Sequence, residues 1–386
     1  MLGNSCGEVD GLYGGDDVPL SYDLYDFTGL DEVKKFLGVV VKFGAGDGSH
    51  NMSFQLQSVA LFYFDRPGKS IFAGPKYSFL ASKDSCSMKI TVLRGGPSAE
   101  REVSLVSGAA VANGLRQAGH DVFESDVGPD NLSALDHPAD VIFPVLHGQF
   151  GESGELQEIL EARGLKFVGS GSKASGLGMD KVLTKKAWEA AGLSTPPYYT
   201  TDGKTIDAHG LSSLIAPCVV KAFGSGSSID VFVCKTLDDA RHAVDVVLSK
   251  HGKALVEKFI KGPELTVGLL EEKALAPIRI VSKTEFFDFE AKYKRNDTEH
   301  RFDTGLPGEV VERCQRLAER ANAIVGARDL ARVDIMLDDG LKPYLLEINT
   351  LPGFTPKSLL PEAAAHGGIP FDTLVDRLAK RAMNRK

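Results

Sequence analysis

The amino-acid sequence predicts an α/β fold, and two observations carry this prediction. From Met88 onward, short apolar runs that resemble strands alternate with stretches of helical periodicity, which is typical of a parallel sheet with helices on both faces. The chain has 386 residues, of which 43% are hydrophobic and 25% are charged. This is the ordinary composition of a globular protein with two or three domains of about 150 residues each.

The composition also argues against several classes of protein. Lys and Arg total 44 against 52 Asp and Glu, which gives a net charge of −8 and disfavours a nucleic-acid or membrane partner. No apolar run approaches the ~20 residues of a membrane-spanning helix, and the first residues lack a secretory signal pattern. Five cysteines, an odd number without CxxC spacing, indicate neither a disulfide framework nor a zinc site. We therefore expect a cytoplasmic protein.

Residues 1–87 differ from the rest of the chain. They are rich in Gly, Ser, Asp and aromatic residues, and they carry no motif with recognisable chemistry. The apolar runs Leu37–Phe43 and Val59–Phe64 are consistent with strands. At Met88 an apolar strand runs into a glycine turn, as α/β domains commonly begin. We interpret Met88 as the functional start and 1–87 as a dispensable extension of unknown structure; a small accessory domain is the alternative.

The elements after Met88 are predicted from apolar periodicity and from the residues that stop each run. Gly164, Gly192 and the Pro196-Pro197 pair end helices. As far as residue 259, the predicted elements are a strand at Ile90–Leu93, a helix at Ser104–Ala118, strands at Asp121–Glu124 and Val141–Leu146, helices at Glu155–Arg163 and Met179–Ala191, strands at Cys218–Phe223 and Val231–Lys235, a helix at Leu237–Lys250 and a strand at Leu255–Phe259.

The last third of the chain predicts antiparallel pairing. Arg332–Leu337 and Tyr344–Ile348 flank an Asp-Asp-Gly turn and predict a hairpin. The other predicted elements are strands at Leu265–Leu270 and Ile278–Val281, a helix at Val310–Val325 and a closing amphipathic helix at Phe371–Arg381.

The hairpin carries the strongest chemical signal. Glu347 and Asn349 are two positions apart and therefore point to the same face of a strand, and the turn folds Asp334 back beside them. Two carboxylates and an amide oxygen suit Mg²⁺ together with phosphate oxygens. Arg332 shares the face of Asp334, where a fixed cation would stabilise negative charge in a transition state. By pattern alone, a solvated hairpin with scattered charges is an equally good interpretation.

A second signal is Lys221, which lies on a strand before the loop Gly224-Ser225-Gly226-Ser227-Ser228. A lysine and several backbone N–H groups placed in this way can surround a polyphosphate. The loop is not a Walker A motif, and by itself it is better interpreted as a flexible turn.

A third signal is the apolar strand that ends in Glu257-Lys258-Phe259-Ile260, with Glu264 shortly after it. Such a strand end can offer main-chain hydrogen bonds to an adenine edge and a carboxylate to a ribose. In isolation, a strand with a charged end is the better interpretation.

Two turns follow strands of the predicted parallel sheet, where ligands of α/β proteins bind. The first runs from Gly95 to Ser104 and contains Glu100, which could bind an ammonium group. The second contains His147, which by itself is more simply a capping or core-edge histidine.

Together these segments resemble the D-alanine–D-alanine ligase family of the ATP-grasp superfamily, over Met88 to the C-terminus. The matching stretches stand in the family's order and at near-family spacing, a combination far more specific than any one of them. They are GGPSAEREVSLVSG (95–108), LHGQFGESGELQ (146–157), GSGSKASGLGMDK (169–181), VVK (219–221), GSS (226–228), EKFIKGPELTV (257–267), FEAKY (289–293), ARVDIML (331–337) and LLEINTLPGFTPKSLLP (345–361).

The resemblance implies a fold and a set of residue roles. The fold is a parallel α/β domain at 88–169 followed by a two-part ATP-grasp domain at 170–257 and 258–386. For ATP it implies Lys181 and Lys221 at the phosphates with Ser227 in the loop that closes over them, Glu257, Lys258, Phe259 and Ile260 around adenine, Glu264 at the ribose, and Lys292 on a loop over the active site. For the metal, two Mg²⁺ (or Mn²⁺) ions, it implies Asp334, Glu347 and Asn349. For the amino acids and the chemistry it implies Glu100 and His147 at the first D-alanine, Tyr293 linked to Ser227 and Glu100, Arg332 and the Gly353 N–H at the oxyanion, and Ser358 and Leu359 at the second D-alanine.

The implied reaction is the ATP-dependent joining of two D-alanine molecules for peptidoglycan synthesis, with homodimers common among relatives. The first carboxylate takes the γ-phosphate and becomes an acyl phosphate, and the second amine then displaces phosphate. Water must be kept out, because the acyl phosphate would hydrolyse. The polar segment 282–305 is the candidate lid.

The chain departs from the family pattern at three places. Asp230 stands where glycine is usual and would repel ATP phosphate if it pointed inward. Residues 300–306 lack the usual aromatic and Pro-Ala pair, and Ser153 replaces a common Asp. Two alternatives follow, a related ligase with another acceptor such as D-lactate and a catalytically degenerate nucleotide-binding paralogue. Tyr293 favours an amine acceptor, and the intact Asp334, Glu347 and Asn349 set opposes degeneracy.

Overall fold

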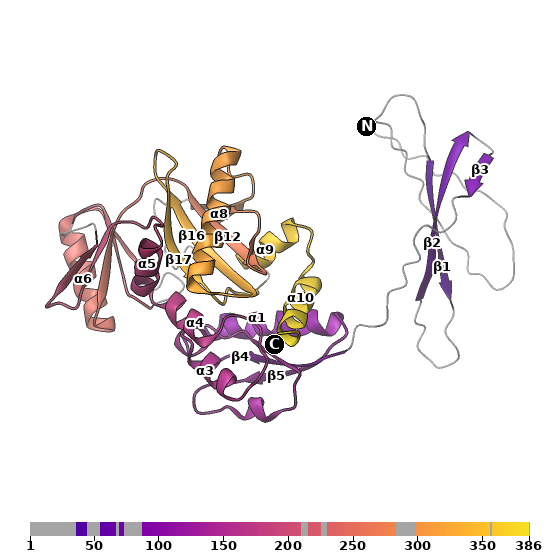
Figure 1. Cartoon of the computed structure of the whole chain (residues 1–386), viewed down its shortest axis with the longest axis horizontal. Helices are drawn as coiled ribbons and strands as arrows, with labels where there is room; N and C mark the ends of the chain where they lie inside the picture. The colour runs from indigo at the N-terminus through magenta and orange to yellow at the C-terminus, as the bar shows by residue number, and fades with distance from the viewer. Residues whose placement is uncertain are drawn as a thin grey trace. The chain divides into compact units, whose positions relative to one another are not determined.

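The chain divides into two compact units, Met1–Cys86 and Ser87–Lys386. Figure 1 shows the computed structural model. It describes residues 36–44, 55–66, 69–72, 87–209, 215–224, 230–282, 298–355 and 357–385.

The first unit contains a small antiparallel sheet. Strand β1 (Phe36–Gly44) pairs with β2 (Gln55–Arg66), and β2 pairs with β3 (Lys69–Phe72). Both apolar runs that predicted strands fall within β1 and β2, so these two predictions are confirmed.

The second unit begins with a three-stranded parallel sheet in the order β5-β4-β6. Alternate side chains of the central strand enter two different cores. Ile90 and Val92 pack with α1 and α10, whereas Leu93 packs with α3 on the other face. The predicted parallel sheet with helices on both faces is therefore confirmed (Figure 1). The elements are β4 (Lys89–Arg94), α1 (Arg101–Gln117), β5 (Asp121–Asp126), the short 3-10 helix η1 (Ser133–Asp136), β6 (Val141–Pro144), α2 (Gln149–Glu152), α3 (Glu155–Ala162) and α10 (Phe371–Met383).

Two helices stand where the sequence predicted one. Asp180 has extended backbone and its carboxylate accepts hydrogen bonds from the N–H groups of Val182 and Leu183, both at 2.9 Å. It therefore caps α5 (Lys181–Ala190) and separates it from α4 (Ser172–Met179). The helix predicted at Met179–Ala191 was wrong at its start, and α4 was missed because its glycines are poor helix formers.

An antiparallel five-stranded sheet follows, in the order β10-β9-β11-β7-β8, with α6 (Leu237–His251) packed on it. Helix α6 begins with a capping box made by Thr236 and Asp239 and ends at Gly252 in the left-handed conformation. The strands are β7 (Tyr198–Thr201), β8 (Ile206–His209), β9 (Cys218–Lys221), β10 (Phe232–Cys234) and β11 (Ala254–Lys258). Strands β7 and β8, which are four residues each, were not predicted from the sequence.

The third sheet has the order β15-β14-β12-β16-β17, with β13 paired to β12. Helix α8 (Gly308–Val325) covers one face with its apolar stripe of Val310, Cys314, Ala318 and Val325. The remaining elements are β12 (Glu264–Leu270), β13 (Lys273–Ala274), β14 (Ile278–Ser282), β15 (Thr298–Arg301), β16 (Leu330–Leu337), β17 (Pro343–Asn349) and α9 (Leu359–His366). β15 and α9 were not predicted.

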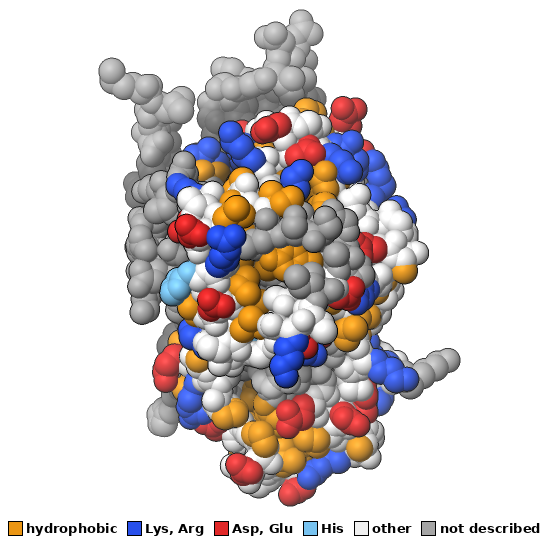
Figure 2. Space-filling model, turned by 90° about the vertical axis from the view of Figure 1, so that its left-hand side faces the viewer, with side chains coloured by type: hydrophobic (Ala, Val, Ile, Leu, Met, Phe, Trp, Pro, Cys, Tyr) orange, Lys and Arg blue, Asp and Glu red, His pale blue; other side chains and the backbone are white. Residues whose placement is uncertain are grey.

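The surface on the α6 side carries basic and acidic side chains intermixed with apolar ones (Figure 2). This face shows no field of a single sign, in agreement with the modest net charge of −8. None of the helices in the described ranges has the length and apolar character that crossing a bilayer requires. The described cysteines Cys218, Cys234 and Cys314 are buried free thiols.

Candidate active site

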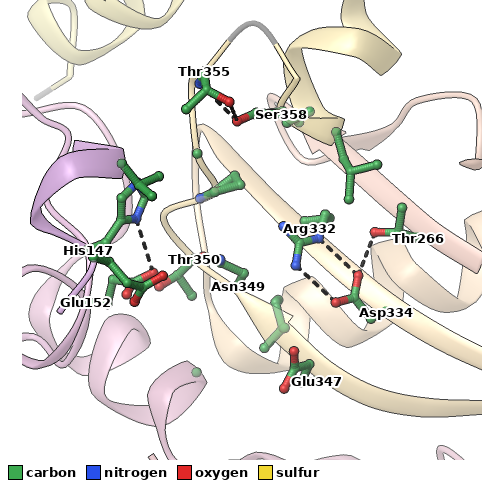
Figure 3. Close-up of a pocket in the computed structure, with 18 of the residues that line it drawn as sticks. His147, Glu152, Thr266, Arg332, Asp334, Glu347, Asn349, Thr350, Thr355 and Ser358 are labelled. Carbon is green, nitrogen blue, oxygen red and sulfur yellow. Dashed lines mark hydrogen bonds and ion pairs between the residues drawn. The ribbon is translucent and has the colours of Figure 1, made fainter. Parts of the chain in front are cut away.

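A cavity of about 440 Å³ lies between the parallel-sheet domain and the third sheet. This volume is within the range of small-molecule sites. It collects predicted residues from distant parts of the chain (Figure 3). Those that line it are Glu100, His147, Lys181, Glu264, Arg332, Asp334, Glu347, Asn349, Gly353, Ser358 and Leu359.

The hairpin β16–β17 places the acidic residues by its register. Asp334 lies opposite Glu347 and Arg332 opposite Asn349, and the pairing shifts by one residue after Asp334. This bulge leaves Leu345 and Ile348 both in the core under α8, although an unbroken strand would turn them to opposite faces. The extra residue therefore directs Glu347 to the cavity, and bulges of this kind often stand beside active sites.

Asp334 is held by two neighbours. Arg332 donates from Nε to Asp334 Oδ1 at 3.0 Å and from Nη2 to Oδ2 at 3.1 Å, and the Thr266 hydroxyl donates to Oδ1 at 2.5 Å. All three residues are buried. The two parallel N–H···O bonds fix both side chains on the cavity wall.

The oxygen donors on this wall fit a magnesium ion. Asp334 and Glu347 lie side by side on adjacent strands and line the cavity with Asn349. Asn349 Oδ1 accepts a hydrogen bond from the Leu351 N–H at 2.8 Å, which orients the amide. Two carboxylates and one amide oxygen, completed by phosphate oxygens and water, form the hard-oxygen set that Mg²⁺ prefers.

Three lysines from two elements lie near this wall, and of these Lys181 lines the cavity. Lys181 opens α5, where its N–H donates to the Phe223 carbonyl at 3.0 Å, and its Nζ lies 3.3 Å from Glu347 Oε2. Lys221 at the end of β9 pairs with the Glu257 carboxylate. The other oxygen of Glu257 pairs with Lys185, a fully buried lysine that was not among the predicted site residues.

The pKa values in this cluster reflect burial and mutual charge. Burial and the neighbouring Lys221 lower the pKa of the Lys185 ammonium, against the opposing effect of Glu257. For Lys221, burial works against the charge, but Glu257 and Glu347 prevail and raise its pKa. The two lysines also outweigh burial at Glu257 and lower the pKa of its carboxyl group.

The segment predicted to contact adenine does not line the cavity of Figure 3. The Glu257 side chain is buried between the two lysines. The N–H groups of Lys258 and Phe259 donate to the carbonyls of Pro197 and Pro217 at 2.8 and 3.3 Å. These two amides are thus engaged within the protein, and an adenine edge would have to be bound by other groups of the segment, Ile260 included.

On the opposite wall, His147 and Glu152 approach from the parallel-sheet domain (Figure 3). The Nδ1 of His147 lies 3.9 Å from Glu152 Oε1, and Glu152 Oε2 accepts from the Gly148 N–H at 2.6 Å. Burial works against the charge on His147, but the carboxylates of Glu152 and Glu100 prevail and raise its pKa. Nε2 of His147 is buried without a hydrogen-bond partner among the described residues, so it can donate to a ligand.

The loop before α9 is shaped by a hydroxyl pair. Ser358 Oγ accepts from the Thr355 N–H at 2.9 Å and contacts the Thr355 hydroxyl at 2.9 Å. A Cβ added to Gly353 would lie 2.9 Å from Ser358 Oγ and 3.8 Å from His147 Nε2. The glycine therefore allows the loop backbone to approach both residues closely.

Three predicted site residues, Ser227, Lys292 and Tyr293, lie outside the described residues, as do residues 283–297 of the candidate lid. The end of that segment forms β15, which pairs with β14. Asp230 has a positive φ of 54°, which explains why glycine suits this position. Its carboxylate pairs with Lys250 at 2.7 Å and His251 at 2.8 Å, and these contacts lower its pKa. The Asp230 carboxylate is therefore paired with two residues of α6, and this pairing reduces the repulsion of ATP phosphate that the sequence suggested.

Known proteins resemble this chain over most of its length. Family models described as D-ala D-ala ligase N-terminus and C-terminus match residues 124–170 and 187–380. The D-alanine--D-alanine ligase of Geobacter sulfurreducens is 42% identical over 295 residues, 75% of this chain and 92% of that protein. The Gluconobacter oxydans enzyme of the same name is 42% identical over 77% of this chain and its full length.

Solved structures agree with the sequence relatives. The D-alanine--D-alanine ligase of Bacillus anthracis superposes with a TM-score of 0.68 at 31% identity, covering 77% of this chain and 98% of that one. A structure of that ligase complexed with ATP superposes with a TM-score of 0.67 at 30% identity, covering 78% and 98%. The ATP-grasp fold that the sequence predicted is confirmed.

Proposed function

The chain belongs to the D-alanine–D-alanine ligase family, and from that premise we propose that it joins two D-alanine molecules in an ATP-dependent reaction. The observation that carries the proposal is the cavity itself. One wall offers cations and oxygen donors for a nucleotide and a metal, Lys181, Asp334 and Glu347, and the other offers Glu100 and His147 for an amino acid.

The first half-reaction activates a carboxylate. Glu100 binds the ammonium group of the first D-alanine, and His147 donates from Nε2 toward its carboxylate. A carboxylate oxygen attacks the γ-phosphorus of ATP, the bond to the β,γ-bridging oxygen breaks, and ADP leaves an acyl phosphate. Lys181 and Lys221 offset charge on the phosphates. Mg²⁺ or Mn²⁺, two ions held by Asp334, Glu347 and Asn349, would add Lewis-acid stabilisation of the transferring phosphoryl group.

The second half-reaction forms the peptide bond. The Ser358 and Leu359 region binds the carboxylate of the second D-alanine. Its neutral amine attacks the acyl carbon, and Arg332 and the Gly353 N–H stabilise the oxyanion. The bond between the acyl carbon and the phosphate oxygen then breaks, and phosphate leaves with the proton that the amine gives up. The same proposal includes a homodimer in the cytoplasm. It gives Ser227, Lys292 and Tyr293 roles around the closing lid. It divides the catalytic part of the chain into domains at about residues 88–169, 170–257 and 258–386.

Product analysis tests the proposed function. With ATP, Mg²⁺ and D-alanine, we expect D-alanyl-D-alanine, ADP and phosphate in equal amounts. ADP release that is independent of D-alanine would contradict the proposal and favour the degenerate paralogue. Competition between D-alanine and D-lactate as acceptors at neutral pH tests the other alternative, and preferential ester formation would overturn the choice of an amine acceptor.

A pH profile tests the role of His147. Its pKa is raised in the folded protein, so its proton is present below that pKa and is lost as the pH rises through it. We expect the KM for D-alanine to increase over that range. Glu152→Gln removes the larger of the two carboxylate effects that favour the proton, so both the His147 titration, followed by NMR, and the KM increase should move to lower pH.

The matched control for this test is Asp376→Asn, which changes a carboxylate that pairs with another buried histidine, His120, at 2.9 Å. Neither residue lines the cavity, so the KM profile should keep its midpoint. An unchanged His147 titration in Glu152→Gln would contradict the assigned cause.

A further inference from the structure

Lys185 carries a buried charge that no step of the proposed reaction uses. It is fully buried, and its Nζ contacts Glu257 and donates to the Thr195 hydroxyl at 2.5 Å. The Thr195 hydroxyl in turn donates to the Leu345 carbonyl of β17 at 2.9 Å. A buried cation is costly unless it is paired and hydrogen-bonded, and here both conditions are met.

Lys185, Glu257 and Lys221 form an ion triad, in which two lysines share one carboxylate, each at a different oxygen. The triad carries a net charge of about +1 when all three groups are ionised. A simple Lys221–Glu257 pair would carry none, and the attraction of Lys221 for a polyphosphate would be largely cancelled by its own partner. The negative charges of Glu264 and Glu347 also act on Lys221. They offset part of its positive charge, which makes the additional positive charge of Lys185 more important.

The helix α5 makes this arrangement possible. Lys181 and Lys185 are four residues apart, so they lie on one face of α5, and that helix packs against both α8 and β17. Figure 1 shows α5 between the α6 layer and the β16–β17 hairpin. One helix thus presents one lysine to Glu347 and a second lysine to Glu257.

We propose that Lys185 is a positioning residue for ATP binding, which holds Glu257 and leaves Lys221 with an uncompensated positive charge for the nucleotide phosphates. The inference rests on the proposed function, since it assumes ATP as the ligand. It does not require Lys185 to touch ATP, because its effect passes through the shared carboxylate.

Binding of ATP in the presence of Mg²⁺, measured by calorimetry, tests the proposal with four variants of the full chain. Lys185→Met removes the charge and Lys185→Gln removes the charge but keeps a hydrogen-bond donor. We expect both to raise the Kd for ATP by about tenfold or more, with the KM for D-alanine within about twofold of the unmodified chain. Lys186→Met is the matched control, because Lys186 is the next residue of α5 but its side chain is 41% exposed and pairs with Asp207 at 2.9 Å.

The double variant Lys185→Met/Glu257→Gln separates electrostatics from packing. It removes one charge of each sign and restores the net charge around Lys221, so it should bind ATP more tightly than Lys185→Met does. A purely structural role for Lys185 predicts that the double variant binds ATP no better than Lys185→Met, and this result would overturn the proposal.

The same measurements keep the two proposals apart. If the unmodified chain fails to bind ATP, the proposed function is wrong. The unmodified chain could bind ATP while both Lys185 variants bind it as tightly as the control Lys186→Met does. In that case only the inference about Lys185 is wrong. Should the methionine variant be insoluble, the glutamine variant carries the comparison.

Discussion

Glu347→Gln is expected to lower kcat/KM for dipeptide formation by at least about a hundredfold. The substitution keeps the shape of the side chain and an oxygen that can accept from Lys181, 3.3 Å away, but it removes one of the two carboxylates that would hold the divalent ion. Loss of that charge weakens metal binding and the stabilisation of the transferring phosphoryl group, which is worth several kcal/mol. Steady-state ADP release measured over a range of Mg²⁺ concentrations is the readout.

The control for this prediction is Glu312→Gln. Glu312 pairs with Arg316 at 3.3 Å on the exposed face of α8, where a single ion pair contributes little. Both variants should unfold near the temperature of the unmodified chain. Undiminished turnover in Glu347→Gln would show that Glu347 does not hold the divalent ion.

Arg332→Lys is expected to lower kcat by about two to three orders of magnitude. Arg332 is buried, and its Nε and Nη2 both donate to Asp334, a geometry that the point charge of a lysine cannot reproduce. The oxyanion would face a flexible ammonium group in place of a fixed guanidinium, and Asp334 would lose the two parallel hydrogen bonds that orient it. Because this stabilisation acts on the transition state, the Kd for ATP should change much less than kcat.

The control here is Arg316→Lys, the same substitution at a solvent-exposed position of α8. Single-turnover measurements locate the defect at the step after ATP binding. A fall in ATP affinity as large as the fall in kcat would assign Arg332 to nucleotide binding instead of oxyanion stabilisation.

The regular parts of the fold were predictable because their patterns are local. In β16 the residues Ala331, Val333 and Ile335 alternate into the core while Arg332 and Asp334 face the cavity, and alternation of this kind is visible in the sequence. The parallel sheet was predictable for a similar reason, since its apolar strands stop at glycine turns.

The helix α4 was missed because tertiary contacts override its composition. A Cβ at Gly178 would lie 2.7 Å from Thr350 Cγ2. Only glycine therefore fits where α4 meets the loop after β17, although glycine has a low helix propensity. Propensity alone cannot anticipate such a contact.

Lys185 was missed although a signal was present. Lys181, Lys185 and the fully buried Trp188 recur at four- and three-residue spacing on one face of α5, which marks that face as the buried one. The partner of Lys185 could not be predicted, because Glu257 comes from a strand distant in sequence. The bulge in β17 is also visible in the sequence, because the two adjacent apolar residues Leu345 and Leu346 interrupt the alternation of the strand.

The central claim is that Asp334, Glu347 and Asn349 hold a divalent ion against the phosphates of the nucleotide. A crystal structure of the chain with ADP and Mg²⁺ tests it most directly. We predict ion density bounded by oxygens of these three side chains and of the phosphates, at the distances of about 2.0–2.1 Å that Mg²⁺ requires. Nucleotide bound with all three side chains turned to bulk solvent and no ion among them would contradict the account.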